Sequence, residues 1–215
     1  MKYKAVIFDL DGTLTDSAPG ILEGARHALQ AMGQPIPEDR VLRLFLGPPL
    51  MISFTKVCGM SFEEAALAQD IYRDHYNREG MLNNTVFPGI RRLLARLKSE
   101  GAFLGVATHK PLQPSLKILE AFDLLRYFDT VAGPEHGEHP DPSKGELIVR
   151  ANPDKLPAVM IGDRATDLIG ARDAGIDGIA ALYGYGSREE FEEIGAQAYA
   201  GQVDDLYDLL GVEKA

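Results

Sequence analysis

Short apolar runs alternate with longer amphipathic stretches along most of this chain, and this alternation constrains the fold more than any other feature. The apolar runs lie at residues 4–8, 103–107, 130–132, 158–161 and 179–183. Runs of this length that are apolar at nearly every position are typical of strands in a parallel sheet, whose two faces are both buried. The alternation therefore predicts an α/β fold, a doubly wound, Rossmann-like parallel sheet of about five strands.

Helical patterns fill the gaps between the runs. Residues 89–100 repeat leucine and isoleucine at helical spacing, with Pro88 before the pattern and Gly101 after it. Similar patterns occupy residues 111–122, 143–151 and 165–174. Ser187 precedes Glu190 by the spacing of a capping box, so a further helix should begin there.

One section, roughly residues 17–84, interrupts the alternation because it contains helical patterns and no convincing strand. A first helix should run from Ser17 to Gly33. Two more helices should cover residues 38–46 and 62–79. The predicted domains are an α/β catalytic core of residues 1–15 and 86–215 and an inserted, all-helical cap of residues 16–85.

The composition restricts the possible partners and surroundings. The 215 residues carry a formal net charge of -10, which repels the phosphate backbone of nucleic acids and the anionic surface of membranes, so we expect neither as a partner. No segment approaches the about 20 apolar residues that span a bilayer, and the first apolar run is too short for a signal peptide. The single cysteine, Cys58, allows no intramolecular disulfide, which suits a reduced, cytoplasmic protein. The sequence does not fix an oligomeric state and is compatible with a monomer.

Polar residues gather where the apolar runs end. The first run is followed by Asp9, Asp11, Gly12 and Thr13, the second by Thr108, and the fourth by Asp163 and Asp167. Lys144 begins the helical pattern before the fourth run. Because the carboxyl ends of parallel strands meet at one edge of a sheet, these side chains should line one crevice.

The acidic members of this group suit phosphoryl transfer. Close carboxylates repel one another unless a hard cation lies among them, and oxygen ligands of this kind suit Mg²⁺. We expect Asp9, Asp11 and Asp163 to hold the metal. Asp9 can then attack phosphorus in line and form an acyl-phosphate. Asp11 can protonate the leaving oxygen and later take a proton from water.

The other members of the group would bind the phosphoryl oxygens. Gly12 lets backbone amides come close, Thr108 can donate its hydroxyl, and Lys144 supplies a point charge. Each has an ordinary explanation when taken alone, since Thr108 could end a strand and Lys144 could be a solvated lysine. A calcium loop would need further acidic ligands after Gly12, where the sequence continues Thr13-Leu14-Thr15. Their joint occurrence in order at strand ends favours an active site.

The same residues resemble the four motifs of a known family, the haloacid dehalogenase superfamily. The motifs are Asp9-Leu10-Asp11-Gly12-Thr13, Thr108, Lys144 and Gly162-Asp163-Arg164-Ala165-Thr166-Asp167. The resemblance covers nearly the whole chain and implies Asp9 as nucleophile and Asp11 as general acid and base. It also implies Mg²⁺ held by Asp9, Asp163 and the backbone carbonyl of Asp11, with Asp167 close by or supporting Lys144. Gly12, Thr13 and His109 are expected to support this site.

Three further segments are similar to the branch of the family named phosphoglycolate phosphatase or 5′-nucleotidase. They are Gly47-Pro48-Pro49-Leu50, Tyr72-Arg73-x-x-Tyr76 and Leu182-Tyr183-Gly184-Tyr185-Gly186-Ser187. The resemblance makes Gly47, Pro48 and Arg73 candidates for substrate contacts from the cap. His109 stands where this branch often has asparagine, which leaves the substrate open. The expected substrate is a small phosphate ester, first phosphoglycolate and next a nucleoside monophosphate.

Asp11 helps to distinguish among the activities of the superfamily. Dehalogenases lack the second aspartate of the first motif because their leaving group needs no proton, so Asp11 argues against dehalogenation. A sugar-phosphate mutase also needs Asp11 and stays possible, as does a binding domain without catalysis.

Overall fold

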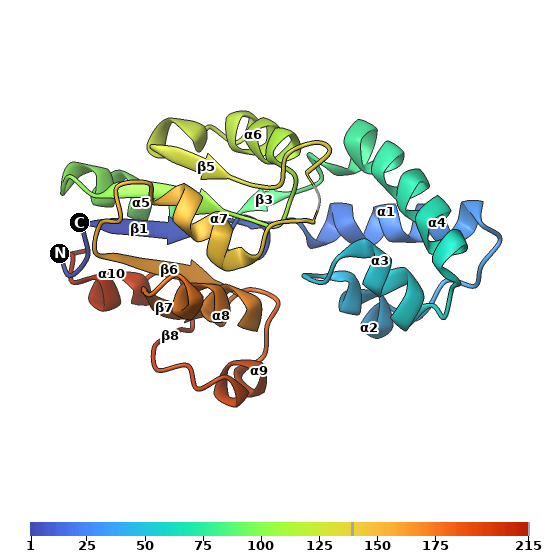
Figure 1. Cartoon of the computed structure of the whole chain (residues 1–215). Helices are drawn as coiled ribbons and strands as arrows, with labels where there is room; N and C mark the ends of the chain where they lie inside the picture. Colours follow the sequence, from blue (N-terminus) through green and yellow to red (C-terminus); the bar gives the residue numbers. More distant parts are fainter. Residues whose placement is uncertain (139, 215) are drawn as a thin grey trace. The chain divides into compact units, whose positions relative to one another are not determined.

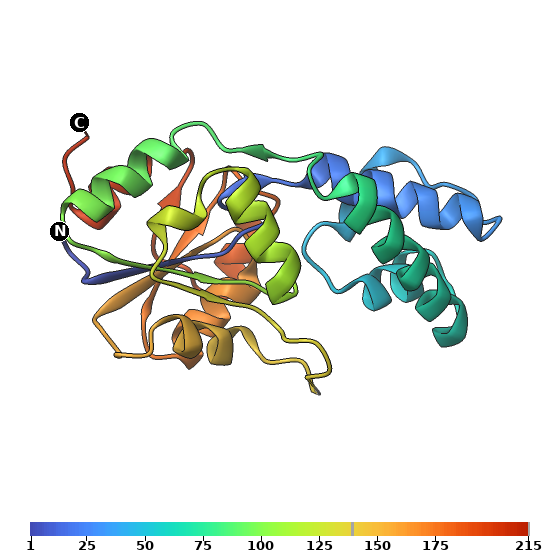
Figure 2. The same cartoon turned by 90° about the horizontal axis from the view of Figure 1, so that it is seen from above.

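The computed structural model of this chain describes residues 1–138 and 140–214. The chain divides into two compact units, whose elements are drawn in Figure 1 and Figure 2. The α/β unit comprises Met1–Asp16 and Val86–Ala215, and the helical unit comprises Ser17–Thr85. The helical unit is thus an insertion that interrupts the α/β unit after its first strand.

A parallel six-stranded sheet forms the centre of the α/β unit, in the order β5-β4-β1-β6-β7-β8. The strands are β1 (Ala5–Phe8), β4 (Phe103–Ala107), β5 (Thr130–Ala132), β6 (Ala158–Gly162), β7 (Asp177–Ala181) and β8 (Tyr199–Ala200). The predicted doubly wound α/β fold is confirmed. The edge strand β8 was not expected from the sequence, because two residues are too few to show a pattern.

Apolar side chains cover both faces of the sheet. Along β1, Ala5 and Ile7 belong to a core cluster with the helices α7 (Lys144–Ala151) and α8 (Ala165–Asp173). Val6 and Phe8 point to the other face of the sheet and are equally buried. The ring of Phe8 meets that of Phe128 edge-on, with the centroids 6.3 Å apart. Figure 2 shows α5 (green) and α7 (gold) on opposite sides of the strands. Burial on both faces explains why the strands read as continuous apolar runs.

Apart from α10 (Asp205–Leu210), which no pattern predicted, the helices of the α/β unit follow the predicted patterns closely. They are α5 (Ile90–Ser99), α6 (Leu112–Ala121), α7 (Lys144–Ala151), α8 (Ala165–Asp173), α9 (Arg188–Glu193) and α10 (Asp205–Leu210), with the 3-10 turn η4 (Leu125–Tyr127). A complete capping box begins α7, since Glu146 N donates to Ser143 Oγ (3.2 Å) and Ser143 N donates to Glu146 Oε2 (2.8 Å). The start of α7 is therefore fixed, and with it the position of Lys144.

The capping box predicted at the start of α9 is only half present. Glu190 N donates to Ser187 Oγ (3.2 Å), as expected. The Glu190 carboxylate, however, accepts hydrogen bonds from Ala165 N (2.7 Å) and Arg164 Nε (3.0 Å). It satisfies an unpaired amide at the start of α8 rather than its own helix, because that amide lies within reach in the folded chain.

The helical unit is built from two long helices and several short ones. They are α1 (Ala18–Ala31), α2 (Asp39–Leu42), the 3-10 turn η1 (Arg43–Phe45), α3 (Leu50–Ile52), the π-helical η2 (Ser53–Val57), α4 (Phe62–His75) and the π-helical η3 (Tyr76–Gly80). The pattern at 38–46 predicted one helix where α2 passes into η1, and α3 with η2 was not predicted. A Cβ on Gly24 would lie 2.8 Å from the Tyr72 ring, so α1 and α4 pack too closely for a larger residue there.

Two short strands join the units in sequence. They are β2 (Thr15–Asp16) and β3 (Thr85–Val86), which pair with each other in a two-stranded sheet. Among the described residues, no helix has both the length and the apolar character needed to cross a bilayer.

Candidate active site

The loop after β1 begins the site. Asp9 N still donates to Ile161 O of β6 (2.9 Å), so the Asp9 side chain is set by the sheet. The loop then turns tightly, since the amides of Leu14 and Thr15 both donate to Leu10 O. Gly12 has φ +84°, and a Cβ there would lie 2.2 Å from Asp163 Oδ2. Glycine is therefore required at this position by its backbone conformation and by the contact.

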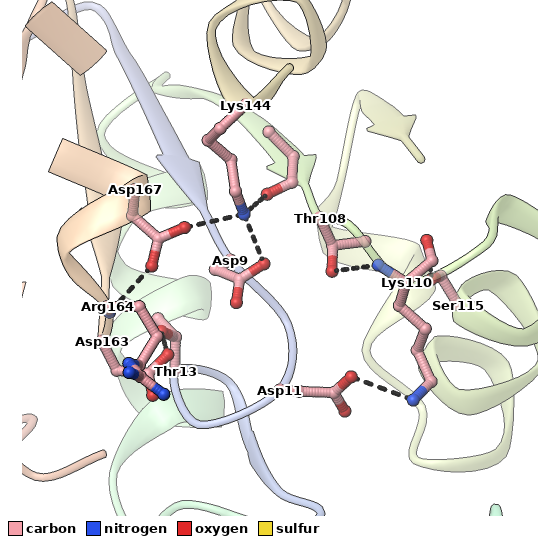
Figure 3. A network of polar contacts seen from close by, with 11 residues as sticks. Asp9, Asp11, Thr13, Thr108, Lys110, Ser115, Lys144, Asp163, Arg164 and Asp167 are labelled. Carbon is pink, nitrogen blue, oxygen red and sulfur yellow. Dashed lines mark hydrogen bonds and ion pairs between the residues drawn. The ribbon is translucent and has the colours of Figure 1, made fainter. Parts of the chain in front are cut away.

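The ammonium group of Lys144 has three acceptors as partners (Figure 3). Its Nζ donates to Asp9 Oδ1 (3.0 Å) and to Ala107 O (3.0 Å), and it lies 2.7 Å from Asp167 Oδ1. An ammonium has three donors, so all of them are used. The side chain is 4% exposed. This lysine therefore joins α7 to the ends of β1 and β4 and to α8 as a fixed charge.

Asp163 and Asp167 extend the acidic cluster from the other side. Asp163 is fully buried; Oδ1 accepts from the Thr13 hydroxyl (3.0 Å) and Oδ2 accepts from Tyr185 N (3.0 Å). Asp167 Oδ2 accepts from Arg164 N at the start of α8 (3.0 Å). One carboxylate oxygen from each of Asp9, Asp163 and Asp167 can be chosen so that all lie within 4.8 Å of one another.

This cluster holds more negative charge than one lysine can balance. Burial raises the pKa of Asp9 to about 6, against the attraction of Lys144. The pKa of Asp163 is raised well above its ordinary value, first by burial and then by Asp167 and Asp9. Burial opposes the charge of Lys144, but Asp167 and Asp9 together raise its pKa. Buried carboxylates in such excess, all offering oxygen, fit a hard divalent cation such as Mg²⁺.

The side chain of Asp11 lies outside this cluster. Asp11 Oδ2 accepts from Lys110 Nζ (2.9 Å), and Asp11 Oδ1 is buried without a hydrogen-bond partner among the described residues. Thr108 is buried beside this pair, and its hydroxyl accepts from Lys110 N (3.2 Å). Figure 3 shows Asp9 facing Lys144 and Asp11 facing Lys110. Asp9 and Asp11 point to different partners, because strand β1 ends at Phe8 and the two residues are not part of one extended segment.

Lys110 is the site residue that the sequence did not reveal. It follows Thr108 by two positions in a loop, and no spacing rule distinguishes it from other lysines nearby. The neighbouring His109 is exposed. In the helical unit, Gly47 turns the chain with φ +104° between η1 and α3, followed by the half-buried Pro48, and Arg73 is exposed on α4. Substrate contacts by Gly47, Pro48 and Arg73 stay predictions.

Known proteins are similar to this chain over most of its length. The sequence pattern of the family described as Haloacid dehalogenase-like hydrolase matches residues 6–181. A Mycobacterium tuberculosis protein named tyrosine-protein kinase PtkA is 37% identical over 96% of this chain and 72% of its own length. A Pseudomonas aeruginosa 5′-nucleotidase is 35% identical, covering 98% of this chain and 96% of its own. A Mesorhizobium japonicum phosphoglycolate phosphatase is 31% identical, covering 100% of this chain and 96% of its own.

Solved structures match nearly the whole chain. The crystal structure of a predicted phosphatase from Clostridium acetobutylicum superimposes with a TM-score of 0.89 and is 39% identical in sequence. The match covers 98% of this chain and 99% of that one. The helical insertion and the α/β unit are thus both part of the shared architecture.

Proposed function

We propose that this chain hydrolyses small phosphate monoesters through an aspartyl-phosphate on Asp9. The premise is that the chain belongs to the haloacid dehalogenase-like hydrolase family and is a phosphatase. The arrangement around Asp9 supports this proposal most directly. Its carboxylate lies at the end of the central strand, hydrogen-bonded to a buried lysine and beside two further carboxylates. A nucleophile held in this way is oriented before the substrate arrives, which removes part of the entropic cost of attack.

The proposed cofactor is Mg²⁺. Asp9, Asp163 and the backbone carbonyl of Asp11 would hold it, while Asp167 remains bonded to Lys144 and to the start of α8. When bound, the ion shields the charge of the phosphate dianion from the carboxylates. The surplus of buried negative charge in the cluster supports a resident cation.

In the proposed first half-reaction, Asp9 attacks phosphorus. A bond forms between an Asp9 carboxylate oxygen and phosphorus as the bond from phosphorus to the ester oxygen breaks. Protonated Asp11 gives its proton to the departing oxygen, so that an alcohol leaves instead of an alkoxide. Lys144 and the Thr108 hydroxyl stabilise the charge on the phosphoryl oxygens during transfer.

In the second half-reaction, water replaces Asp9 on phosphorus. Asp11 is now a carboxylate and takes a proton from the water as the water oxygen bonds to phosphorus. The bond between phosphorus and Asp9 breaks, which releases inorganic phosphate and returns Asp9 and Asp11 to their starting states. One aspartate thus carries the phosphoryl group and the other carries the proton.

Phosphoglycolate is the first proposed substrate and a nucleoside monophosphate the second. Relatives with both names are similar to this chain over nearly its whole length. The kinase name of the mycobacterial relative adds a different acceptor to test, since a phosphoryl group on Asp9 could pass to a tyrosine hydroxyl in place of water. ATP with a tyrosine-containing peptide therefore belongs among the tested substrates.

The test is a phosphate-release panel on the purified chain. It contains phosphoglycolate, nucleoside monophosphates, sugar phosphates and an aryl phosphate, each with Mg²⁺ or with chelator. Transfer from ATP to the peptide releases no phosphate and is measured separately as phosphotyrosine. Asp9→Asn is compared with Asp154→Asn, which changes an exposed carboxyl of the same unit. Mg²⁺-dependent release that only Asp9→Asn abolishes is the expected result, with a transient mass gain of one phosphoryl group on the unmodified enzyme. Unchanged turnover in Asp9→Asn would overturn the mechanism.

A further inference from the structure

Lys110 lies in the site without a role in the proposed reaction. Its Nζ is 2.9 Å from Asp11 Oδ2, and the two side chains are only 10% and 20% exposed. Its backbone amide donates to the hydroxyl of Thr108, so the segment that carries it is tied to a phosphate-binding residue (Figure 3). The Ser115 hydroxyl also donates to Lys110 O (3.3 Å). The position of Lys110 is therefore fixed from its own backbone.

The two oxygens of Asp11 have different surroundings. Oδ2 is held by the ammonium of Lys110, whereas Oδ1 is buried and accepts no hydrogen bond from any described residue. A buried acceptor without a donor is unfavourable, and native proteins rarely retain one without a functional reason. An ester oxygen that needs a proton, or the water that replaces it, would provide the missing partner.

We propose that Lys110 is a positioning residue for Asp11: it holds Oδ2 so that Oδ1 faces the reacting oxygen. The proposal rests on the function proposed above, in which Asp11 transfers the proton. An aspartate side chain rotates about two bonds, and proton transfer requires the acid within hydrogen-bond reach of its partner. Anchoring one oxygen fixes those rotations and leaves the other oxygen for the proton.

Leaving-group dependence separates this role from a structural one. Benzyl phosphate and 4-nitrophenyl phosphate are similar in size and carry the same single phosphate. Benzyl alkoxide leaves only with a proton, whereas 4-nitrophenolate leaves readily without one. The parameter kcat/KM includes only steps up to departure of the leaving group, so it excludes the later attack of water. Loss of acid positioning should therefore lower kcat/KM for benzyl phosphate selectively.

The variants are Lys110→Met, Lys110→Arg, Asp11→Asn and a control, Lys117→Met, which removes an exposed lysine on α6. Lys110→Met should lower kcat/KM for benzyl phosphate roughly 10- to 100-fold, a part of what general acid catalysis contributes, with a much smaller effect on 4-nitrophenyl phosphate. Lys110→Arg should restore most of the loss, because it keeps a cation there. In the Asp11→Asn background, adding Lys110→Met should have little further effect on benzyl phosphate.

The outcomes distinguish the two proposals. An equal loss on both substrates for Lys110→Met, with selective loss for Asp11→Asn, would overturn positioning by Lys110 and leave the proposed reaction intact. It would mean that the lysine binds phosphate or supports the fold. If Asp11→Asn also shows no selectivity, the acid role of Asp11 fails and the role of Lys110 fails with it. Mg²⁺-dependent thermal unfolding of each variant confirms that the chain folds.

Discussion

The loop after β1 contributes one aspartate to each of two aspartate–lysine pairs, and the two pairs differ in how deeply their side chains are buried. The pair of Asp9 and Lys144 is built at strand and helix ends, and Lys144 has a third contact in Asp167. The pair of Asp11 and Lys110 joins two loops, and both side chains reach the surface in part. In the proposed reaction, the inner pair would fix the nucleophile among charges that are costly to separate, while the outer pair would orient the carboxylate that exchanges protons.

The largest contrast should appear when each lysine loses its charge. Lys144→Met leaves Asp9, Asp163 and Asp167 buried without a cation, which we expect to lower the metal-free unfolding free energy by about 3–5 kcal/mol. It should also lower kcat by about 10³ or more, since it removes charge stabilisation of the transferring group. Lys110→Met should cost less than Lys144→Met, because it leaves one partly buried carboxylate without its cation instead of a cluster of three buried ones. Urea unfolding in chelator measures the loss of stability in each of the two variants.

Equal destabilisation by the two substitutions would contradict the distinction between an inner and an outer pair. A comparison at two pH values sharpens it. Acidification should partly rescue Lys144→Met, because the carboxylates left behind can protonate, and should leave Lys110→Met nearly unchanged.

Removal of the metal should separate the side chain of Asp11 from that of Asp163. A ligand at 100 times its Kd stabilises the folded state by about 2.7 kcal/mol, so saturating Mg²⁺ should raise the thermal midpoint by roughly 5–10 °C. Asp163→Asn should lose most of this rise. Asp11→Asn should keep most of it, because the Asp11 side chain is outside the cluster and its backbone carbonyl is unchanged. Thermal unfolding with and without chelator tests this, and a full loss in Asp11→Asn would place that side chain on the metal.

The contribution of Asp9 to the stability of the metal-free protein should decline as the pH rises from about 4 to 6. Asp9 has a folded pKa of about 6, above its ordinary value of 3.8, so the folded state binds its proton more tightly than the unfolded state does. Stability from this group is full below the unfolded pKa and declines as the pH rises through the folded pKa. The fall should be on the order of 1–3 kcal/mol, and the raised pKa of Asp163 extends it upward. Saturating Mg²⁺ should reduce the fall. The measurement uses a His109→Gln background, because desolvation and the charge of Lys144 lower the pKa of His109 to about 4, which by itself makes stability rise with pH over this range. In that background, a rise of stability in chelator would contradict the raised pKa of Asp9.

The smallest effect should come from the helix cap that precedes Lys144. Ser143→Ala removes half of the capping box of α7 and should cost about 1 kcal/mol. Ser61→Ala removes the same feature from α4 in the helical unit and is the matched control. Because Lys144 is held by three acceptors, we expect both variants to retain kcat. A selective loss of kcat in Ser143→Ala would show that the cap also positions the lysine.

Much of the α/β unit could be predicted because its signals are local. The strands β4 and β5 begin and end at the residues that the apolar runs indicate, and α5 to α8 agree within a residue or so at each end. Short elements carry too little pattern, so β8, α3 and η2 were missed. The helix predicted to begin at Ser187 is present, but the Glu190 half of its capping box is not, because that carboxylate accepts from an amide of α8, which is distant in sequence.

The sequence by itself determined the fold class and the polar residues that follow the strands, because burial on both faces of a sheet shows in patterns within a few residues. Only the tertiary structure decided which charges pair. Asp167 joins Asp9 and Lys144, whereas Asp11 turns to Lys110, 99 positions away. Side-chain contacts of this kind depend on where a loop turns after its strand ends, and distance along the chain holds no information about them.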